Sequence, residues 1–226
     1  MHVLVVAATD AEIAPFVAEL HDGADTGSRV RTYTRAGHAV DVLTTGVGMV
    51  ATAAWCSRAL AQGGYDLALN LGVSGSFDRA LAPGTSVHVV SDRIAELGAE
   101  DDDAFLTIQE LKLLGENEFP FCDGRLVNAT PPLNAALGRL RAVDGITVNT
   151  VHGNERSIAA VARRFNPQVE SMEGAAFMYA CLVQGLPFAQ VRAVSNVVER
   201  RNRRAWKIVD AIDNLAEAAL GILDHA

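Results

Sequence analysis

Continuously apolar runs alternate with amphipathic stretches along most of this chain. Residues 1–8 are apolar and rich in β-branched side chains, which is typical of a strand buried on both faces. Apolar residues at helical spacing follow after Thr9 or Asp10, either of which can cap a helix. The same alternation predicts further strands at residues 30–34, 39–44, 66–71, 85–94, 146–151 and 187–194. It predicts further helices around residues 49–60, at 133–140, around 158–165, from about 174 to 184 and over 203–224.

Residues 99–127 interrupt this alternation. They contain an acidic run at 100–103 and a segment punctuated by glycine and proline at 114–124, with one short strand predicted at 105–108. Long connections of this kind are often binding loops or interface segments. The acidic run itself is interpreted as a solvated surface.

Strands that alternate with helices predict an α/β fold. A mixed, largely parallel central sheet flanked by helices is expected, because parallel strands need helical crossovers. The chain has 226 residues, half of them hydrophobic, which fits one domain over residues 1–226 with a large core.

Composition and charge limit the kinds of partner that the chain is expected to bind. The net charge of -8 argues against a nucleic-acid surface, and the one basic run, at residues 200–204, is interpreted as a solvated or interface patch. The three cysteines are widely spaced and no metal-ligand spacing occurs, so neither a metal nor another cofactor is expected. The apolar start is too short for a signal peptide, and no stretch approaches the ~20 residues that span a bilayer. A cytoplasmic protein without membrane contact is therefore expected.

Residues with useful chemistry gather where predicted strands end. Glu12 opens the helix after the first strand, Glu173 lies in the turn 170–174 before an alanine-rich helix, and Asn196 follows a late strand. A turn of small residues over 70–76 lets backbone N–H groups approach a ligand closely. In open α/β sheets such strand ends form the ligand crevice. A carboxylate in a first turn also stabilises a helix by itself, so a structural role for both glutamates stays open.

Four tracts in this order resemble the nucleoside phosphorylase/nucleosidase family, specifically its hydrolase branch. They are VVAATDAEI around Glu12, NLGVSGS at 70–76, ESMEGAA at 170–176 and RAVSN at 192–196. The longer tracts NLGVSGSF, SDRIAELGAED and ESMEGAAF, with the tail after Asn196, resemble most closely the branch members that release hypoxanthine during menaquinone biosynthesis. The resemblance implies the fold described above and a homo-oligomer that acts on a small-molecule purine nucleoside.

The resemblance also implies roles for individual residues. The methylthioadenosine/S-adenosylhomocysteine nucleosidases activate water with a glutamate after the first strand, which Glu12 matches. Their Met-Glu pair binds the ribose, which Met172 and Glu173 match. Ser74, Gly75 and Ser195 are expected at the base. Arg156 aligns loosely with a base-stacking aromatic residue of the family. A guanidinium can also stack on a purine, so Arg156 is expected at the base; a plain surface position is the alternative.

Asn196 departs from those nucleosidases, which carry an aspartic acid there to protonate adenine N7. A 6-oxopurine offers acceptors at both N7 and O6, and an amide can donate toward them but cannot supply a proton. Asn196 is therefore predicted to select hypoxanthine over adenine, although it can also merely cap a turn. Thr9 replaces a methionine beside the 5′ group, and Ser171 replaces a glutamate, with Glu170 displaced by one position.

Water is the predicted nucleophile, because the tract 70–76 carries no cation to hold phosphate and Arg79 is the nearest one in sequence. Three alternatives remain at this stage. They are a methylthioadenosine/S-adenosylhomocysteine nucleosidase, a phosphorylase, and a nucleoside-binding protein without activity. Retention of both Glu12 and Glu173 argues against the last, since binding alone needs no base for water.

Overall fold

The computed structural model describes residues 1–24 and 29–225 of the chain. The strands of the main sheet are β1 (His2–Ala7), β2 (His21–Ala24), β3 (Val30–Arg35), β4 (His38–Thr44), β5 (Leu67–Ser76), β6 (Ser86–Ile94), β9 (Phe121–Cys122), β10 (Arg125–Val127), β11 (Arg141–Thr147), β12 (Val169–Ser171) and β13 (Phe188–Val197). A separate hairpin pairs β7 (Gly98–Asp101) with β8 (Ala104–Thr107). The helices are α1 (Asp10–Ala18), α2 (Met49–Gln62), α3 (Glu155–Phe165), α4 (Gly174–Gln184) and α5 (Ile208–Asp224).

The main sheet is mixed and runs in the order β2-β3-β4-β1-β5-β12-β11-β6-β10-β9. Strand β13 pairs with both β5 and β6, so the five strands β5, β12, β11, β6 and β13 close on themselves. Strand β5 pairs first with β1 and then, near its end, with β12. The carboxyl ends of β1, β5 and β13 therefore reach the same edge of the sheet, because these three strands are parallel.

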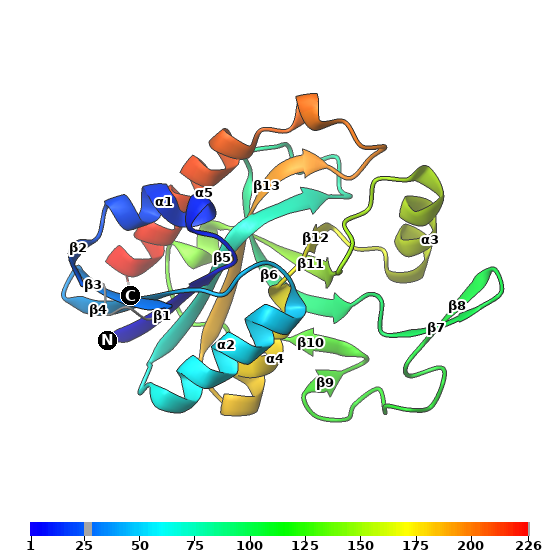
Figure 1. Ribbon diagram of the computed structural model, residues 1–226, viewed down its shortest axis with the longest axis horizontal. Coiled ribbons are helices and arrows are strands. Elements are labelled where there is room, and N and C mark those ends of the chain that lie inside the picture. Colours follow the sequence, from blue (N-terminus) through cyan, green and yellow to red (C-terminus); the bar gives the residue numbers. More distant parts are fainter. Residues whose placement is uncertain (25–28, 226) are drawn as a thin grey trace.

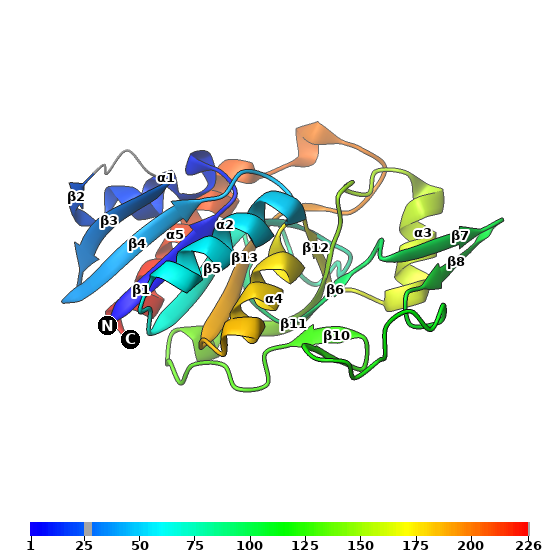
Figure 2. The same ribbon diagram turned by 60° about the horizontal axis from the view of Figure 1, so that its bottom comes forward.

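Helices cover the sheet on two faces. Helices α1 and α5 pack together on one face and α2 packs against α4 on the other, as Figures 1 and 2 show. Each face has its own apolar cluster; side chains of α1 and α5 join the first, and side chains of α2 and α4 join the second. Helix α3 and the β7–β8 hairpin lie side by side at one end of the molecule (Figures 1 and 2). The predicted α/β fold with a mixed sheet is confirmed.

The predicted helix at 133–140 is wrong. Only a short 3-10 turn, Leu137–Arg139, forms there. The Asn134 carboxamide oxygen accepts the N–H groups of Ala136 and Leu137, each at 2.9 Å, which is a side-chain turn that competes with helix formation. The strand predicted at 146–151 begins at Arg141 and ends at Thr147.

Other predicted boundaries also shift. The tract 72–76, predicted as a turn, continues as strand β5 because β12 and β13 supply hydrogen-bonding partners to its end. The last helix begins at Ile208 rather than residue 203. Strands β2, β7, β9, β10 and β12 are not predicted from the sequence; β12 occupies part of the tract predicted as the turn 170–174. Within residues 1–24 and 29–225, no helix is both long and apolar enough to cross a membrane.

Candidate active site

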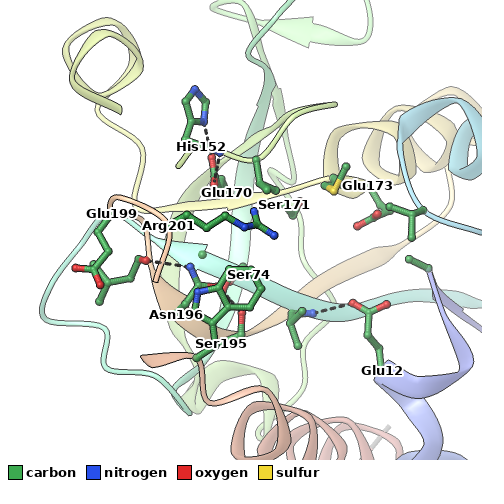
Figure 3. A pocket seen from close by; sticks show the side chains of 18 of the residues that line it. Glu12, Ser74, His152, Glu170, Ser171, Glu173, Ser195, Asn196, Glu199 and Arg201 are labelled. Atoms are coloured by element: carbon green, nitrogen blue, oxygen red, sulfur yellow. Dashed lines mark hydrogen bonds and ion pairs between the residues drawn. The ribbon is translucent and has the colours of Figure 1, made fainter. Parts of the chain in front are cut away.

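A cavity of about 280 Å³ opens at the edge where β1, β5 and β13 end (Figure 3). Seven of the eight residues predicted for the site line it, and these are Glu12, Ser74, Gly75, Met172, Glu173, Ser195 and Asn196. They come from α1, β5, β13 and the turn before α4, which are far apart in the sequence. The fold therefore brings the two glutamates and the Asn196 amide to one cavity.

Glu12 is both a helix cap and part of the cavity wall. Its Oε2 accepts the Thr9 N–H at 3.1 Å and the Thr9 hydroxyl at 2.9 Å, while the Thr9 side chain accepts the Glu12 N–H, which makes a capping box. Its Oε1 accepts the Val73 N–H of β5 at 3.2 Å. The two roles left open by the sequence are thus compatible, since the cap holds the carboxylate at the cavity.

Glu173 lies on the opposite side of the cavity, just before α4. Its Oε1 accepts the Gly48 N–H at 3.1 Å, and its Oε2 lies 3.6 Å from a guanidinium nitrogen of Arg192. Burial raises the pKa of Glu173, and the charge of Arg192 opposes that effect. The Glu12 charge adds to the rise, which agrees with two carboxylates that face the same space.

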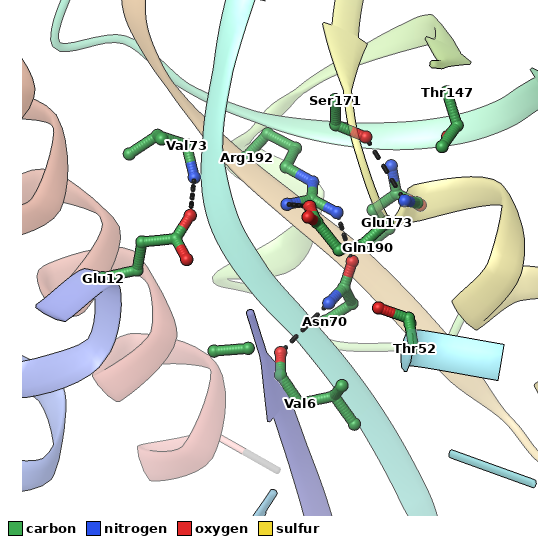
Figure 4. A network of polar contacts seen from close by, with 12 residues as sticks. Val6, Glu12, Thr52, Asn70, Val73, Thr147, Ser171, Glu173, Gln190 and Arg192 are labelled. Atoms are coloured by element: carbon green, nitrogen blue, oxygen red, sulfur yellow. Dashed lines mark hydrogen bonds and ion pairs between the residues drawn. The ribbon is translucent and has the colours of Figure 1, made fainter. Parts of the chain in front are cut away.

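Arg192 of β13 lies next to Glu173 in a buried polar network, although it does not itself line the cavity (Figure 4). Its side chain is only 1% exposed, and its guanidinium donates to the Asn70 carboxamide oxygen at 2.5 Å. A Cβ atom on Gly72 would lie 2.2 Å from the Arg192 Nη1 and 3.2 Å from the Glu12 Oε1. The missing side chain at Gly72 therefore lets a buried cation approach both glutamates.

A bulge in β13 sets the direction of Asn196. Val194 pairs with Ser74 of β5 and Asn196 with Gly75, so Ser195 is an extra residue in the strand. The Ser195 hydroxyl donates to the Asn196 Oδ1 at 2.8 Å, and the Asn196 Nδ2 donates to the Val197 carbonyl at 2.9 Å. These contacts hold the amide in place and use one of its two N–H groups, while Asn196 itself lines the cavity.

The prediction that Arg156 lies against the base is wrong. Arg156 makes an ion pair with Asp103 at 2.8 Å, with both side chains more than 80% exposed, and it lies outside this cavity. His152 lines the cavity instead, where its N–H and its Nδ1 approach the buried Glu170 carboxylate at 3.0 and 2.7 Å.

The segment between β13 and α5, residues 199–206, covers one side of the cavity; we call it the strap. Four strap residues line the cavity: Glu199, Arg201, Asn202 and Trp206. None of them was predicted as a site residue, because the basic run 200–204 resembles a solvated patch. Trp206 was expected on a helix, but it lies in extended backbone before α5.

These groups provide the elements of glycosidic bond cleavage. The cavity is lined by the Glu12 carboxylate, which can accept a proton, and by the buried Glu173 carboxylate. The Asn196 amide, a hydrogen-bond donor, lines it as well. An oxocarbenium-like centre between the two carboxylates would be stabilised electrostatically. Among the described residues, no group of three or more His, Cys, Asp or Glu side chains is arranged to hold a metal ion.

Comparison with known proteins assigns the fold and these tracts to one family. A model described as the phosphorylase superfamily matches residues 2–226. A futalosine hydrolase of Acidothermus cellulolyticus is 36% identical over 225 residues, covering 96% of this chain and 89% of that protein. One of Thermus thermophilus is 34% identical over 185 residues, covering 80% of each. The crystal structure of a 5′-methylthioadenosine/S-adenosylhomocysteine nucleosidase from Colwellia psychrerythraea with adenine has a TM-score of 0.82 at 21% identity, covering 100% of this chain and 95% of that one.

Proposed function

This chain belongs to the phosphorylase superfamily, and on that premise we propose that it is a purine nucleoside N-ribohydrolase, namely a futalosine hydrolase. It cleaves the bond between ribose and base in futalosine and releases hypoxanthine, as a step of menaquinone biosynthesis. One observation carries the proposal: Glu12, Glu173 and Asn196 line one cavity. The relatives at 34% and 36% identity support the choice of substrate.

The proposed reaction divides among these side chains. Glu12, fixed by its cap and by the Val73 N–H, accepts a proton from the attacking water. Met172 packs against the ribose, and Glu173 accepts its hydroxyl groups and stabilises the positive charge that develops on the sugar. Ser74, Gly75 and Ser195 border the base, and the free N–H of Asn196 donates to it.

Water suits this cavity better than phosphate as the nucleophile. The structure does bring a cation to the glycine tract, since Arg192 lies against Gly72, but its charge is shared with Glu173 and Asn70. A phosphate dianion in the same place would face both the Glu12 and the Glu173 carboxylates. Repulsion of that kind disfavours phosphorolysis.

The direct test is hypoxanthine release from futalosine by the purified protein in phosphate-free buffer. We expect turnover without phosphate and a free sugar product. The variant Glu12→Gln is expected to bind futalosine but to lose roughly 100-fold or more in kcat, because it removes the general base. A product phosphorylated at C1′ would indicate a phosphorylase, and binding without any turnover would indicate a nucleoside-binding protein.

A methylthioadenosine/S-adenosylhomocysteine nucleosidase is the alternative enzyme. Asn196 lacks the proton for adenine N7, and the Thr9 hydroxyl, which faces the expected 5′ end, is bonded to Glu12. Faster cleavage of an adenine nucleoside than of futalosine by the wild-type protein would favour this alternative.

We further propose a homo-oligomer in the cytoplasm. Val50 on α2 and Val183 and Tyr179 on α4 are exposed on two helices that pack together, which suits contact with a second copy. All three cysteines are free thiols, as expected in a reducing compartment.

A further inference from the structure

The strap brings one member of the basic run into the cavity. Arg200, Arg203 and Arg204 lie outside the lining, whereas the Arg201 side chain extends into it, as Figure 3 shows. Among the described residues that line the cavity, Arg201 carries the only guanidinium, beside the carboxylates of Glu12, Glu170, Glu173 and Glu199. The fold thus places one guanidinium, on a solvent-exposed residue, in the lining of a cavity that also holds four carboxylates.

The strap is tied to the cavity wall at both ends. The Arg201 N–H donates to the Gly153 carbonyl at 3.2 Å, and the Lys207 N–H donates to the Ser195 carbonyl at 2.8 Å. The two backbones lie close together here, since a Cβ atom on Gly153 would be in ordinary van der Waals contact with the Arg201 Cβ at 3.5 Å. The Arg201 guanidinium lies 5.3 Å from the centre of the Trp206 ring, a cation–π contact that restricts its position.

Arg201 has no ionic partner in the described part of the chain, although four carboxylates line the same cavity. Its contacts are the indole of Trp206 and the backbone link to Gly153. A guanidinium with several unused donors that faces a ligand cavity is suited to an acceptor on the ligand.

The departing purine supplies such an acceptor. When the bond between C1′ and N9 breaks, its electron pair moves onto the base, and negative charge spreads to N7 and O6 of hypoxanthine. Asn196 can offer only one N–H, because the other is committed to the Val197 carbonyl. It also has no proton to transfer. One neutral donor is a weak counterpart for a purine anion.

We propose that Arg201 is a further catalytic residue, whose guanidinium binds the N7–O6 edge of the leaving hypoxanthine and stabilises its negative charge. The proposal rests on the futalosine hydrolase function above. An arginine fork matches two neighbouring acceptors, and N7 and O6 of a 6-oxopurine are such a pair. Arg201 keeps its protons throughout. Water adds to C1′ and gives one proton to Glu12. A solvent water protonates the hypoxanthine anion, and Glu12 then gives its proton to the hydroxide that this leaves.

The same contact also selects the base. Adenine presents an amino donor at position 6 in place of O6, and this donor would face the donors of Arg201. Arg201 on the strap and Asn196 on β13 therefore both favour hypoxanthine over adenine.

The test compares two leaving groups. The variant Arg201→Gln is assayed with futalosine and with the analogue that carries 4-nitrophenolate in place of hypoxanthine, because nitrophenolate departs without assistance. We expect kcat with futalosine to fall roughly 100- to 1000-fold, as when one preorganised donor is removed. Turnover of the nitrophenyl analogue should stay within about threefold of the wild type. Guanidinium ions at millimolar concentration should restore part of the futalosine activity of Arg201→Ala.

Arg204→Gln is the matched control, since it removes a strap guanidinium that lies outside the cavity, and it should leave both activities unchanged. Equal losses on both substrates for Arg201→Gln would mean that the residue only shapes the strap, and no loss on either would mean that it is idle. Both results would overturn the proposal. A wild-type protein that cleaves neither substrate would instead refute the proposed function.

Discussion

At the scale of single residues, the cavity owes its order to side chains that also hold the backbone. Glu12 closes a capping box, Glu173 accepts the Gly48 N–H, and Asn196 is bonded on both sides to its own strand. Each of these groups keeps one face toward the cavity. Preorganisation of this kind lowers the cost of reaching the transition state, because no group has to reorient during the reaction.

Exchanging the amide for an acid should change the preferred base. In Asn196→Asp the new carboxyl can carry a proton to N7 of adenine, so cleavage of the adenine analogue of futalosine should rise relative to futalosine by about tenfold or more. The measurement is the ratio of kcat/KM for the two substrates. An unchanged ratio would remove the assigned role of Asn196 in selecting the base.

Asp92 on β6 is a buried acid with a predictable effect on stability. It is fully buried and accepts the Thr147 hydroxyl at 2.9 Å and the Gln190 amide at 3.1 Å. Thr147 in turn accepts the Ala175 N–H at the start of α4. Burial raises the pKa of Asp92 from 3.8 to about 6, so the charged form is disfavoured in the folded state.

The sign of the pH effect follows from that pKa. Because the folded-state pKa is the higher one, the contribution of Asp92 to stability is complete below about pH 4 and is lost as the pH rises through about 6. The neutral variant Asp92→Asn should therefore gain stability relative to the wild type over this range, by up to about 3 kcal/mol. Urea unfolding of both proteins between pH 4 and 7.5 measures the difference. A difference that does not vary with pH would show that Asp92 does not titrate there.

At the scale of elements, apolar runs were sufficient to predict the buried strands. Residues 1–8, 39–44 and 85–94 lie on largely buried strands close to the predicted bounds, because apolar runs occur where both faces are covered. Residues 30–34 also form a strand as predicted, but β3 alternates polar side chains and is not buried. The end of β5 was predicted as a turn, since glycine and serine favour turns locally, and the strand that forms β13 was predicted to end at residue 194. Both strands continue, to Ser76 and Val197, because they pair with each other there and β12 also pairs with the end of β5. No local pattern records these distant partners.

The same limit applies to the candidate site. Glu12, Met172, Glu173 and Asn196 were found through short tracts that keep their spacing within one element. His152 and the strap residues were missed as site residues, because they lie in irregular segments that only the folded chain brings to the cavity. Arg192 was missed as well; it does not line the cavity but contacts Glu173, which does. Arg192 was read as part of a buried strand, and only the missing Cβ of Gly72 on the neighbouring strand makes room for its guanidinium.

Gly72 on β5 is therefore a sensitive position. In Gly72→Ala the new methyl group would overlap the Arg192 guanidinium, which cannot move away because it is buried and bonded to Asn70. We expect a loss of about 1–3 kcal/mol in the free energy of unfolding and a large loss of kcat. Gly138→Ala is the control, since nothing lies within 4 Å of a Cβ there, and it should change stability by less than about 0.5 kcal/mol. Equal stability of the two variants would show that the strands can separate at this point.

At the scale of the whole molecule, the two faces of the sheet differ in how they meet solvent. Val50 on α2 is 82% exposed and Val209 on α5 is 71% exposed, but only α2 packs against a helix that exposes further apolar side chains, Tyr179 and Val183 of α4. An assembly through α2 and α4 would cover this apolar surface.

Mass measurement tests that assembly. We expect light scattering of the wild type at micromolar concentration to give a multiple of 23.9 kDa, and Val50→Asp to give the mass of one chain, because burying a carboxylate at the interface is costly. Val209→Asp, on the opposite face, should keep the wild-type mass. If Val50→Asp keeps it as well, the interface lies elsewhere.

The extra residue in β13 bears on how related chains are to be compared. Ser195 is an extra residue in β13, and it shifts the register of the residues that follow Val194. The side chain of residue 196 therefore depends for its direction on the number of residues that precede it in the strand, and not only on its identity. A deletion of one residue at this place would swing an unchanged asparagine away from the purine and leave a carboxylate-lined chamber that no longer distinguishes one base from another.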